Sequence, residues 1–285
     1  MEQLQAVLTR LNMARGCNAV AQRRTPEEIE GARADNFNRS AGDLNEVDGY
    51  DCPVCRNKGV IMLTVEGPGG WWSTATKDCK CMKIRKTIRQ MQRSGLKNVI
   101  RDLTFEKFVA TEPWQRTLKQ AAMDYAANPA GWFYIGGQSG IGKSHLCTAI
   151  CREFLLAGRE VKYMLWRDEV TRLKALVTDG DEYHKLMDTY KRVEILYIDD
   201  LFKTGRDKDN NPQRPTAADI NAAFEIINAR SLDSKLLTII SSECTTNDLL
   251  DIDEATGGRI CEKAQVFSIA PDRTKNYRLR KVTEL

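Results

Sequence analysis

The chain has 285 residues, of which 42% are hydrophobic and 29% charged, and its formal net charge is +4. These values are typical of a folded, water-soluble protein with one large domain or two smaller ones. No stretch approaches the roughly 18 apolar residues that a membrane-spanning helix requires, and the N-terminus lacks the layout of a signal peptide. We therefore expect a cytoplasmic protein with no membrane contact, in which the nine cysteines are thiols or metal ligands and not disulfides.

The N-terminal region, residues 1–48, is polar and has a helical pattern. Thr25, Pro26 and Glu28 predict the start of a helix, because these residue types at the cap, first and third positions satisfy or remove free backbone N–H groups. Between residues 49 and 81 the composition changes. Glycine, proline and tryptophan become frequent there, and four cysteines appear.

The four cysteines have the spacing of metal ligands. Cys52 and Cys55 are two residues apart, and Cys79 and Cys81 follow with one residue between them. Four thiolates suit tetrahedral Zn²⁺, and a metal would help a segment poor in aliphatic side chains to fold. The alternatives are unliganded thiols or a thioredoxin-type redox pair, although no βαβ pattern surrounds the cysteines. Neither His145 nor His184 is predicted as a ligand, and five cysteines are predicted to be buried apolar residues, namely Cys17, Cys147, Cys151, Cys244 and Cys261.

Positive charge is concentrated after the cysteines. Residues 82–93 have one apolar stripe, formed by Ile84, Ile88 and Met91, which predicts a helix. No acidic residue lies between Cys79 and Arg101, but eight basic ones do, namely Lys80, Lys83, Arg85, Lys86, Arg89, Arg93, Lys97 and Arg101. Such local charge indicates either contact with a polyanion or a solvated helix face, and charge alone does not choose between them.

From about residue 102, predicted strands alternate with predicted helices. Strands separated by helices predict a parallel sheet that is covered on both faces. The predicted strands are 132–135, 161–165, 194–198, 236–241 and 265–269, and the predicted helices are 143–157, 168–177, 216–231 and a short one capped at 245–248.

The segment GQSGIGKSH follows the first of these strands and opens the first helix. Gly137, Gly142, Lys143 and Ser144 satisfy the P-loop pattern, in which glycines let backbone N–H groups and the helix N-terminus face phosphates. Lys143 supplies a cation for the β- and γ-phosphates of ATP, and Ser144 supplies a hydroxyl ligand for Mg²⁺. The nucleotide contacts are therefore predicted to be Gly137, Gln138, Ser139, Gly140, Ile141, Gly142, Lys143, Ser144 and His145.

The segment ILYIDDLF at 195–202 predicts the acidic half of the same site. A hydrophobic strand that ends in Asp199 and Asp200 places carboxylates at the sheet edge where ligands bind. Asp199 is predicted to hold the Mg²⁺ shell, and Asp200 to deprotonate the attacking water. Arg259, near the start of a predicted helix, is a candidate for stabilising transition-state charge from a neighbouring subunit, or is an ordinary surface arginine.

These features together resemble the bacterial and phage replicative helicase loaders of the DnaC/DnaI type. Those proteins are AAA+ ATPases related to the replication initiator DnaA and the transposition helper IstB. The resemblance covers most of the chain and depends on the segments DCPVCRNKG, CKCMKIRKTIRQMQRSGL, TFEKF, GQSGIGKSHL, ILYIDDLF, TIISSE and NYRLRK.

The resemblance implies roles for individual residues. Lys143 with Ser144 becomes the Walker A pair, Asp199 with Asp200 the Walker B pair, and Arg259 the arginine finger. TIISSE becomes sensor 1, but Glu243 replaces the usual asparagine, so that Ser242 and Glu243 both stay open. Arg278 or Arg280 matches a late arginine near the nucleotide, and the helical lid of most AAA+ proteins is expected to be absent.

The resemblance also implies a domain plan and a function. Residues 1–95 are expected to form a small helical zinc-binding domain that binds the hexameric replicative helicase, and residues 96–285 an AAA+ domain with a five-stranded parallel sheet. The ATPase domains are expected to associate with one another and to bind single-stranded DNA, through 82–93 or 203–215. The alternatives are an IstB-like transposition helper, a metabolic P-loop kinase, and a zinc-dependent DNA-binding regulator.

Overall fold

The computed structural model describes residues 24–93, 95–96, 98–205, 208 and 213–279. The chain divides into two compact units, one formed by Met1–Gly42 with Pro53–Cys79 and the other by Asp43–Cys52 with Lys80–Leu285. This division groups residues 80–95 with the larger unit, whereas the sequence assigned them to the N-terminal domain. Several predictions concern residues that lie outside the described ranges, namely those for 1–23 with Cys17, for Lys97, for Arg280 and for most of 206–212.

The smaller unit contains helix α2 (Pro26–Arg39) and an antiparallel hairpin of β1 (Val60–Glu66) and β2 (Trp72–Asp78). The predicted start of α2 is confirmed, because Thr25 and Glu28 form a reciprocal capping box. The hairpin was not predicted, and its strands lack the regular alternation of apolar and polar residues that marks a half-buried strand. Asn38 joins α2 to β1, since its amide accepts from the Met62 N–H at 3.0 Å and donates to the Met62 carbonyl at 2.8 Å.

The larger unit is built on a five-stranded sheet with the order β4-β5-β6-β3-β7. Every neighbouring pair in it is parallel, so the predicted five-stranded parallel sheet is confirmed. The strands are β3 (Trp132–Gly137), β4 (Val161–Leu165), β5 (Ile195–Leu201), β6 (Leu237–Ser242) and β7 (Ala264–Ile269).

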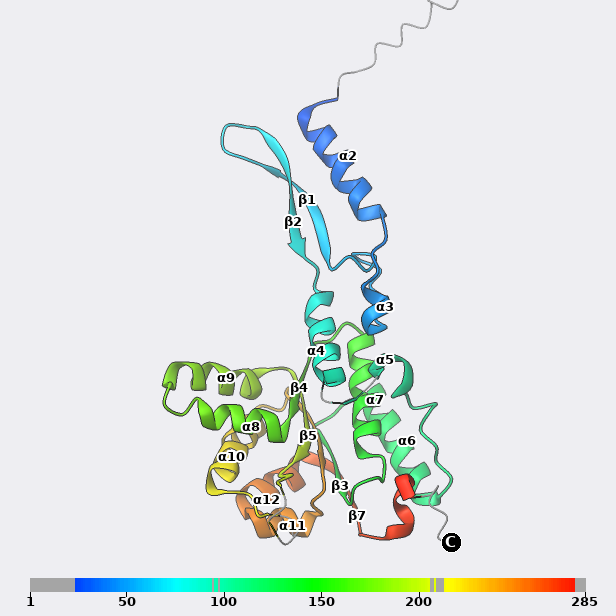
Figure 1. Cartoon of the computed structure of the whole chain (residues 1–285), viewed down its shortest axis with the longest axis vertical. Helices are drawn as coiled ribbons and strands as arrows, with labels where there is room; N and C mark the ends of the chain where they lie inside the picture. The colour runs from blue at the N-terminus through cyan, green and yellow to red at the C-terminus, as the bar shows by residue number, and fades with distance from the viewer. Residues whose placement is uncertain (1–23, 94, 97, 206–207, 209–212, 280–285) are drawn as a thin grey trace, which may run out of the picture. The chain divides into compact units, whose positions relative to one another are not determined.

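Helices cover both faces of this sheet, with α6 and α7 along one side and α8, α10 and α12 along the other (Figure 1). The capping boxes predicted at Thr216 and Thr245 are both present, at the starts of α10 and α11. The helices of this unit are α3 (Leu44–Asp48), α4 (Cys81–Arg93), α5 (Val99–Asp102), α6 (Pro113–Ala127), α7 (Lys143–Leu156), α8 (Trp166–Ala175), α9 (Gly180–Arg192), α10 (Ala217–Ser231), α11 (Thr246–Ile252) and α12 (Glu254–Lys263), followed by the 3₁₀ turns η1 (Arg273–Lys275) and η2 (Tyr277–Leu279).

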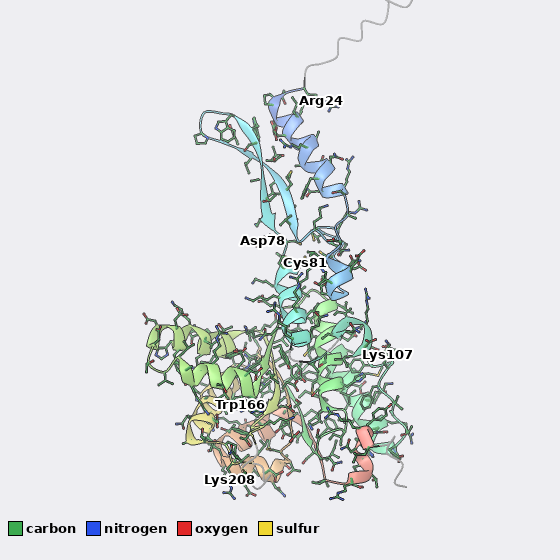
Figure 2. All side chains as sticks on the ribbon, in the orientation of Figure 1. Arg24, Asp78, Cys81, Lys107, Trp166 and Lys208 are labelled. Carbon is green, nitrogen blue, oxygen red and sulfur yellow. The ribbon has the colours of Figure 1, made fainter. Side chains whose placement is uncertain are left out.

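Side chains of the central strands alternate between the two helical layers. Trp132 and Tyr134 belong to one buried cluster together with Trp166, which is labelled in Figure 2. Phe133, between them, packs on the opposite face against Tyr125 of α6, with ring centroids 5.1 Å apart. Because both faces bury large side chains, the strand ends are held rigidly at the edge where a phosphate group would bind.

The expectation that the basic residues between Cys79 and Arg101 face solvent or a polyanion is wrong for Arg85. Arg85 on α4 is fully buried and forms an ion pair with Asp48 of α3, so it is not available to a polyanion. The apolar stripe of α4 is confirmed, because Ile84, Ile88 and Met91 are all buried. Among the residues that the structure describes, no helix has the length and apolar character needed to cross a membrane.

Candidate nucleotide-binding site

The glycine-rich loop connects the end of β3 to the start of α7, which begins at Lys143. Gly142 has φ +98°, a left-handed conformation that L side chains seldom adopt, and a Cβ there would lie 2.6 Å from the Phe108 ring. Gly140 is also left-handed, and a Cβ on it would overlap the Asn276 side chain at 1.9 Å. The loop therefore requires glycine at both positions. Its geometry directs the free N–H groups of the α7 N-terminus toward one point, which favours an anion there.

Lys143, the first residue of α7, is the cation nearest in sequence to this anion-binding point. Its side chain is buried, and Nζ donates to the carbonyls of Gly137 at 2.7 Å and Gln138 at 2.9 Å. Burial lowers the pKa of Lys143, while the negative charges of Asp200 and Glu243 oppose that change. The ammonium group thus has carbonyl partners that phosphate oxygens can replace.

Asp199 lies at the carboxyl end of β5, buried beside the loop. It accepts a hydrogen bond from Ser144 Oγ at 3.0 Å, which brings the two predicted Mg²⁺ ligands together across 55 residues of sequence. Three further hydroxyl groups fix the carboxylate, from Tyr163 at 3.0 Å, Tyr197 at 2.8 Å and Ser241 at 2.5 Å. A hydroxyl and a carboxylate that face each other are hard oxygen ligands of the kind that Mg²⁺ prefers, so these residues fit that ion.

Asp200 follows in a bulge of β5, where the pairing with β6 shifts register between Ile198 and Leu201. Its φ of +59° is left-handed, and its N–H donates to Ser241 Oγ at 3.0 Å. The bulge turns the Asp200 side chain into the cavity lining, in contrast to the buried Asp199. The carboxylate pairs there with Lys203 Nζ at 2.8 Å.

The structure distinguishes the two candidates for the polar sensor. Ser242 is fully buried, donates to the Leu201 carbonyl at 2.7 Å and accepts from the Cys244 N–H at 3.1 Å. Glu243 instead lines the cavity next to the loop, and its carboxylate lies 3.1 Å from Lys203 Nζ. Of the two, only the glutamate is placed to face a nucleotide.

A cavity of about 330 Å³ opens in front of the loop. Residues distant in sequence complete its wall, among them Phe108 and Val109 before α6, and Tyr277 and Arg278 at the C-terminal end. Sequence reasoning missed all of these except Arg278. Phe108 lies in the TFEKF segment and Tyr277 in the NYRLRK segment, but neither segment indicated that these residues line the site.

The C-terminal segment 272–278 contacts the glycine-rich loop through hydrogen bonds. The Gln138 amide exchanges two hydrogen bonds with the backbone of Asp272, and the Tyr277 N–H donates to the Gly140 carbonyl at 2.9 Å. Arg278 donates to Ser139 Oγ at 3.3 Å. The structure therefore brings Arg278 to the loop, while the competing residue Arg280 lies beyond the described part of the chain.

His145 and Arg259 occupy different positions with respect to the cavity. His145 lines it, with Nε2 2.8 Å from the Thr104 carbonyl oxygen, and burial lowers its pKa. Arg259 lies in the middle of α12, not near a helix start as predicted, because α12 already begins at Glu254. Its guanidinium stacks on Phe224 at 5.0 Å and donates to the Ala255 carbonyl at 2.8 Å, in a surface hollow outside the nucleotide cavity.

The four predicted metal ligands lie together. The sulfur atoms of Cys52, Cys55, Cys79 and Cys81 are all within 4.8 Å of one another and all buried, and Cys81 is the first residue of α4, labelled in Figure 2. Tetrahedral Zn²⁺ with Zn–S bonds of about 2.3 Å requires sulfurs about 3.8 Å apart, so the cluster fits a zinc site. Cys147 and Cys151 are buried in α7 as predicted, whereas Cys261 is exposed.

The parallel sheet, the glycine-rich loop and the acidic strand end define a P-loop ATPase of the AAA+ class. A family model described as IstB-like ATP binding protein matches residues 76–244, which is more than half of the chain. The chain belongs to this family of ATP-binding proteins.

The individual proteins to which the chain is similar have low sequence identity to it. The phage-like element PBSX protein XkdC of Bacillus subtilis (strain 168) is 29% identical over 231 residues, covering 77% of this chain and 82% of that protein. The replicative helicase loader DnaC of Escherichia coli (strain K12) is 28% identical over 130 residues, covering 44% of this chain and 51% of that protein. The crystal structure of the DnaC helicase loader has a TM-score of 0.50 and 19% identity, covering 61% of this chain and 98% of that one, which supports the fold.

Proposed function

We propose that this ATPase binds a hexameric replicative helicase and places it on single-stranded DNA, with ATP hydrolysis timing the release. The similarity to the protein named replicative helicase loader DnaC carries this proposal. That alignment spans about half of DnaC. The helicase partner and the DNA are therefore part of our proposal and do not follow from the shared fold. The cavity beside the P-loop supports the hydrolytic part, because it gathers the groups that phosphoryl transfer requires.

In the proposed reaction Lys143 turns from its carbonyl partners to the β- and γ-phosphates. Ser144 and Asp199 would hold Mg²⁺, which would supply positive charge to neutralise the phosphates. A water oxygen forms a bond to the γ-phosphorus while the bond to the β–γ bridging oxygen breaks, and ADP leaves. Asp200, the more exposed of the two aspartates, accepts the proton of that water.

The position of Arg259 supports an ATPase site that is shared between neighbouring subunits. Within one chain it lies outside the nucleotide cavity and stacks on Phe224 at a surface hollow. An arginine in that position reaches a γ-phosphate if the ATPase units assemble side by side and each supplies its arginine to the next. Self-association is therefore part of the proposal.

Zinc at the cysteine cluster is the second part of the proposal. The smaller unit has few buried apolar side chains, with Ala34 the one buried residue of α2, so a bound metal would supply stability that its core does not. We assign the helicase contact to the N-terminal region that this metal would hold, residues 1–95.

Purified protein is expected to contain about one zinc ion per chain. Replacing Cys79 with serine should remove the metal and lower the melting temperature, because one of four thiolate ligands is lost. Elemental analysis and the absorption of a Co²⁺-substituted sample measure the metal directly. Cys261→Ser is the matched control, since Cys261 is exposed and outside the cluster. Equal zinc content in both variants would contradict the assignment.

Single-stranded DNA requires exposed positive charge without base recognition. On α4 the exposed basic residues are Lys83, Lys86 and Arg93, although Lys83 also pairs with Glu160 at 3.0 Å. We propose these residues, with the basic segment 203–215 that follows β5, as the DNA-contacting surface, apart from Lys203, which lines the nucleotide cavity.

The function is tested by co-purification with the replicative helicase of the same host, with ATP and single-stranded DNA added in turn. A complex that forms with ATP and dissociates after DNA and hydrolysis supports the loader. Capture of a transposase in place of the helicase would favour the IstB-like alternative, which the family model supports.

A further inference from the structure

Lys203 lies between the two carboxylates that face the nucleotide cavity. Its Nζ is 2.8 Å from Asp200 and 3.1 Å from Glu243, and all three side chains are part of the cavity wall. Asp200 is the penultimate residue of β5 and Glu243 follows β6, so one ammonium group bridges the ends of two neighbouring strands.

The backbone is shaped to allow this bridge. Asp200 and Phe202 both have left-handed φ angles, +59° and +60°, which residues other than glycine seldom adopt. The chain reverses there, and the Lys203 N–H donates to the Asp200 carbonyl at 2.9 Å. Left-handed backbone that neighbouring structure maintains is typical of functional sites.

The charges in the cavity explain why a cation is needed at this place. A γ-phosphate bound by the loop brings negative charge into a wall that already carries Asp200 and Glu243, and like charges repel unless a cation lies between them. Lys143 and Arg278 lie on the loop side of the cavity. On the strand-end side, Lys203 is the cation that is paired with both carboxylates.

The same contact has a consequence for Asp200. The Asp200 oxygen that lies 2.8 Å from Lys203 Nζ is engaged by the ammonium group. Burial alone would lower the pKa of Lys203, but its hydrogen bonds and charge interactions with Asp200 and Glu243 raise it, so Lys203 remains charged.

We propose that Lys203 is the γ-phosphate-sensing residue of this site, and that Glu243 positions it. Without a γ-phosphate, Lys203 pairs with Asp200 and occupies its carboxylate. When ATP binds, Lys203 stays anchored by Glu243 and transfers its second contact from Asp200 to the γ-phosphate. The Asp200 carboxylate is then released to contact the attacking water. The inference rests on the proposed ATP site and assigns the discrimination between ATP and ADP to the Lys203–Glu243 pair.

The test is the ratio of affinities for a non-hydrolysable ATP analogue and ADP, measured by displacement of a fluorescent ADP in the presence of Mg²⁺. Lys203→Met keeps the aliphatic stem and removes the charge. It should weaken binding of the analogue about tenfold and change ADP binding less than about twofold, because ADP lacks the phosphate that Lys203 contacts. Lys203→Arg, which retains the charge, should keep most of the ratio.

Lys185→Met is the matched control, because Lys185 pairs with Glu182 at 2.7 Å in the same three-residue spacing on α9, outside the cavity lining. This variant should leave the ratio unchanged. Glu243→Gln should reduce the ratio in the wild-type background and have no further effect in the Lys203→Met background, since it acts through Lys203.

If Lys203 has a purely structural role, Lys203→Met should weaken the binding of the ATP analogue and of ADP equally, or of neither. Either outcome would overturn the inference. If Lys143→Ala abolishes nucleotide binding while Lys203→Met leaves the ratio intact, the inference fails and the ATP site stands. If wild-type protein binds no nucleotide, the proposed function itself fails.

Discussion

Replacing Lys143 with alanine is expected to reduce ATP affinity on the order of 100-fold. The Lys143 ammonium group is buried at the start of α7, with two carbonyl partners that phosphate oxygens replace on binding. Charge-assisted hydrogen bonds of this kind contribute about 1.5–3 kcal/mol each, and every 1.4 kcal/mol is a factor of ten. Titration calorimetry with ATP and Mg²⁺ measures the loss.

A control is needed because Lys143 is buried. The melting temperature of the variant without nucleotide checks that the fold is intact, because the substitution removes a buried aliphatic stem and two hydrogen bonds, although alanine itself is well accepted in a helix. Mixing Lys143→Ala with Arg259→Ala subunits should then restore part of the ATPase activity, because some junctions carry an intact loop and an intact arginine. Unchanged ATP affinity in Lys143→Ala would show that the nucleotide binds elsewhere.

Replacing Asp200 with asparagine is expected to leave ATP binding within about twofold and to lower the turnover number by about 100-fold or more. Asparagine has the shape of aspartate and can still accept the Lys203 hydrogen bond, but it cannot take a proton. General base catalysis typically contributes 10²- to 10⁴-fold to a rate. Phosphate release under saturating ATP measures the turnover, and nucleotide titration measures the binding.

The neighbouring aspartate provides the comparison. Asp199→Asn should impair binding of Mg²⁺-ATP as well as turnover, because Asp199 is held by four hydroxyl groups, that of Ser144 among them, and is the predicted metal ligand. If Asp200→Asn turned over ATP at the wild-type rate while Asp199→Asn did not, the base would have to be another residue, and Asp199 would be the first to test.

Sequence patterns were sufficient for the parts of the site that are contiguous in the chain. The strand–loop–helix order around GQSGIGKS and the apolar strand before Asp199 each have a local physical signature, and both lie where they were expected. The cysteine cluster was also predictable, because metal ligation imposes short spacings within each pair.

The parts that failed depend on tertiary structure. Arg85 has the sequence signature of an exposed basic residue, and only its position opposite Asp48 on α3 shows that it is buried. Tyr277 reaches the loop through a backbone bond to Gly140, a contact across more than a hundred residues that no local pattern records. The bridge made by Lys203 depends on the left-handed conformations of Asp200 and Phe202, and a phenylalanine in the sequence does not predict such a conformation.

The transfer of a replicative helicase to covalently closed circular single-stranded DNA tests the central proposal most directly, because a closed protein ring cannot thread onto a closed DNA circle unaided. The host helicase is incubated with this protein, ATP and the circle, and DNA-bound helicase is separated by gel filtration. The proposal predicts helicase on the circle with wild-type protein and ATP, and none with Lys143→Ala. Equal recovery of DNA-bound helicase with and without this protein would contradict it.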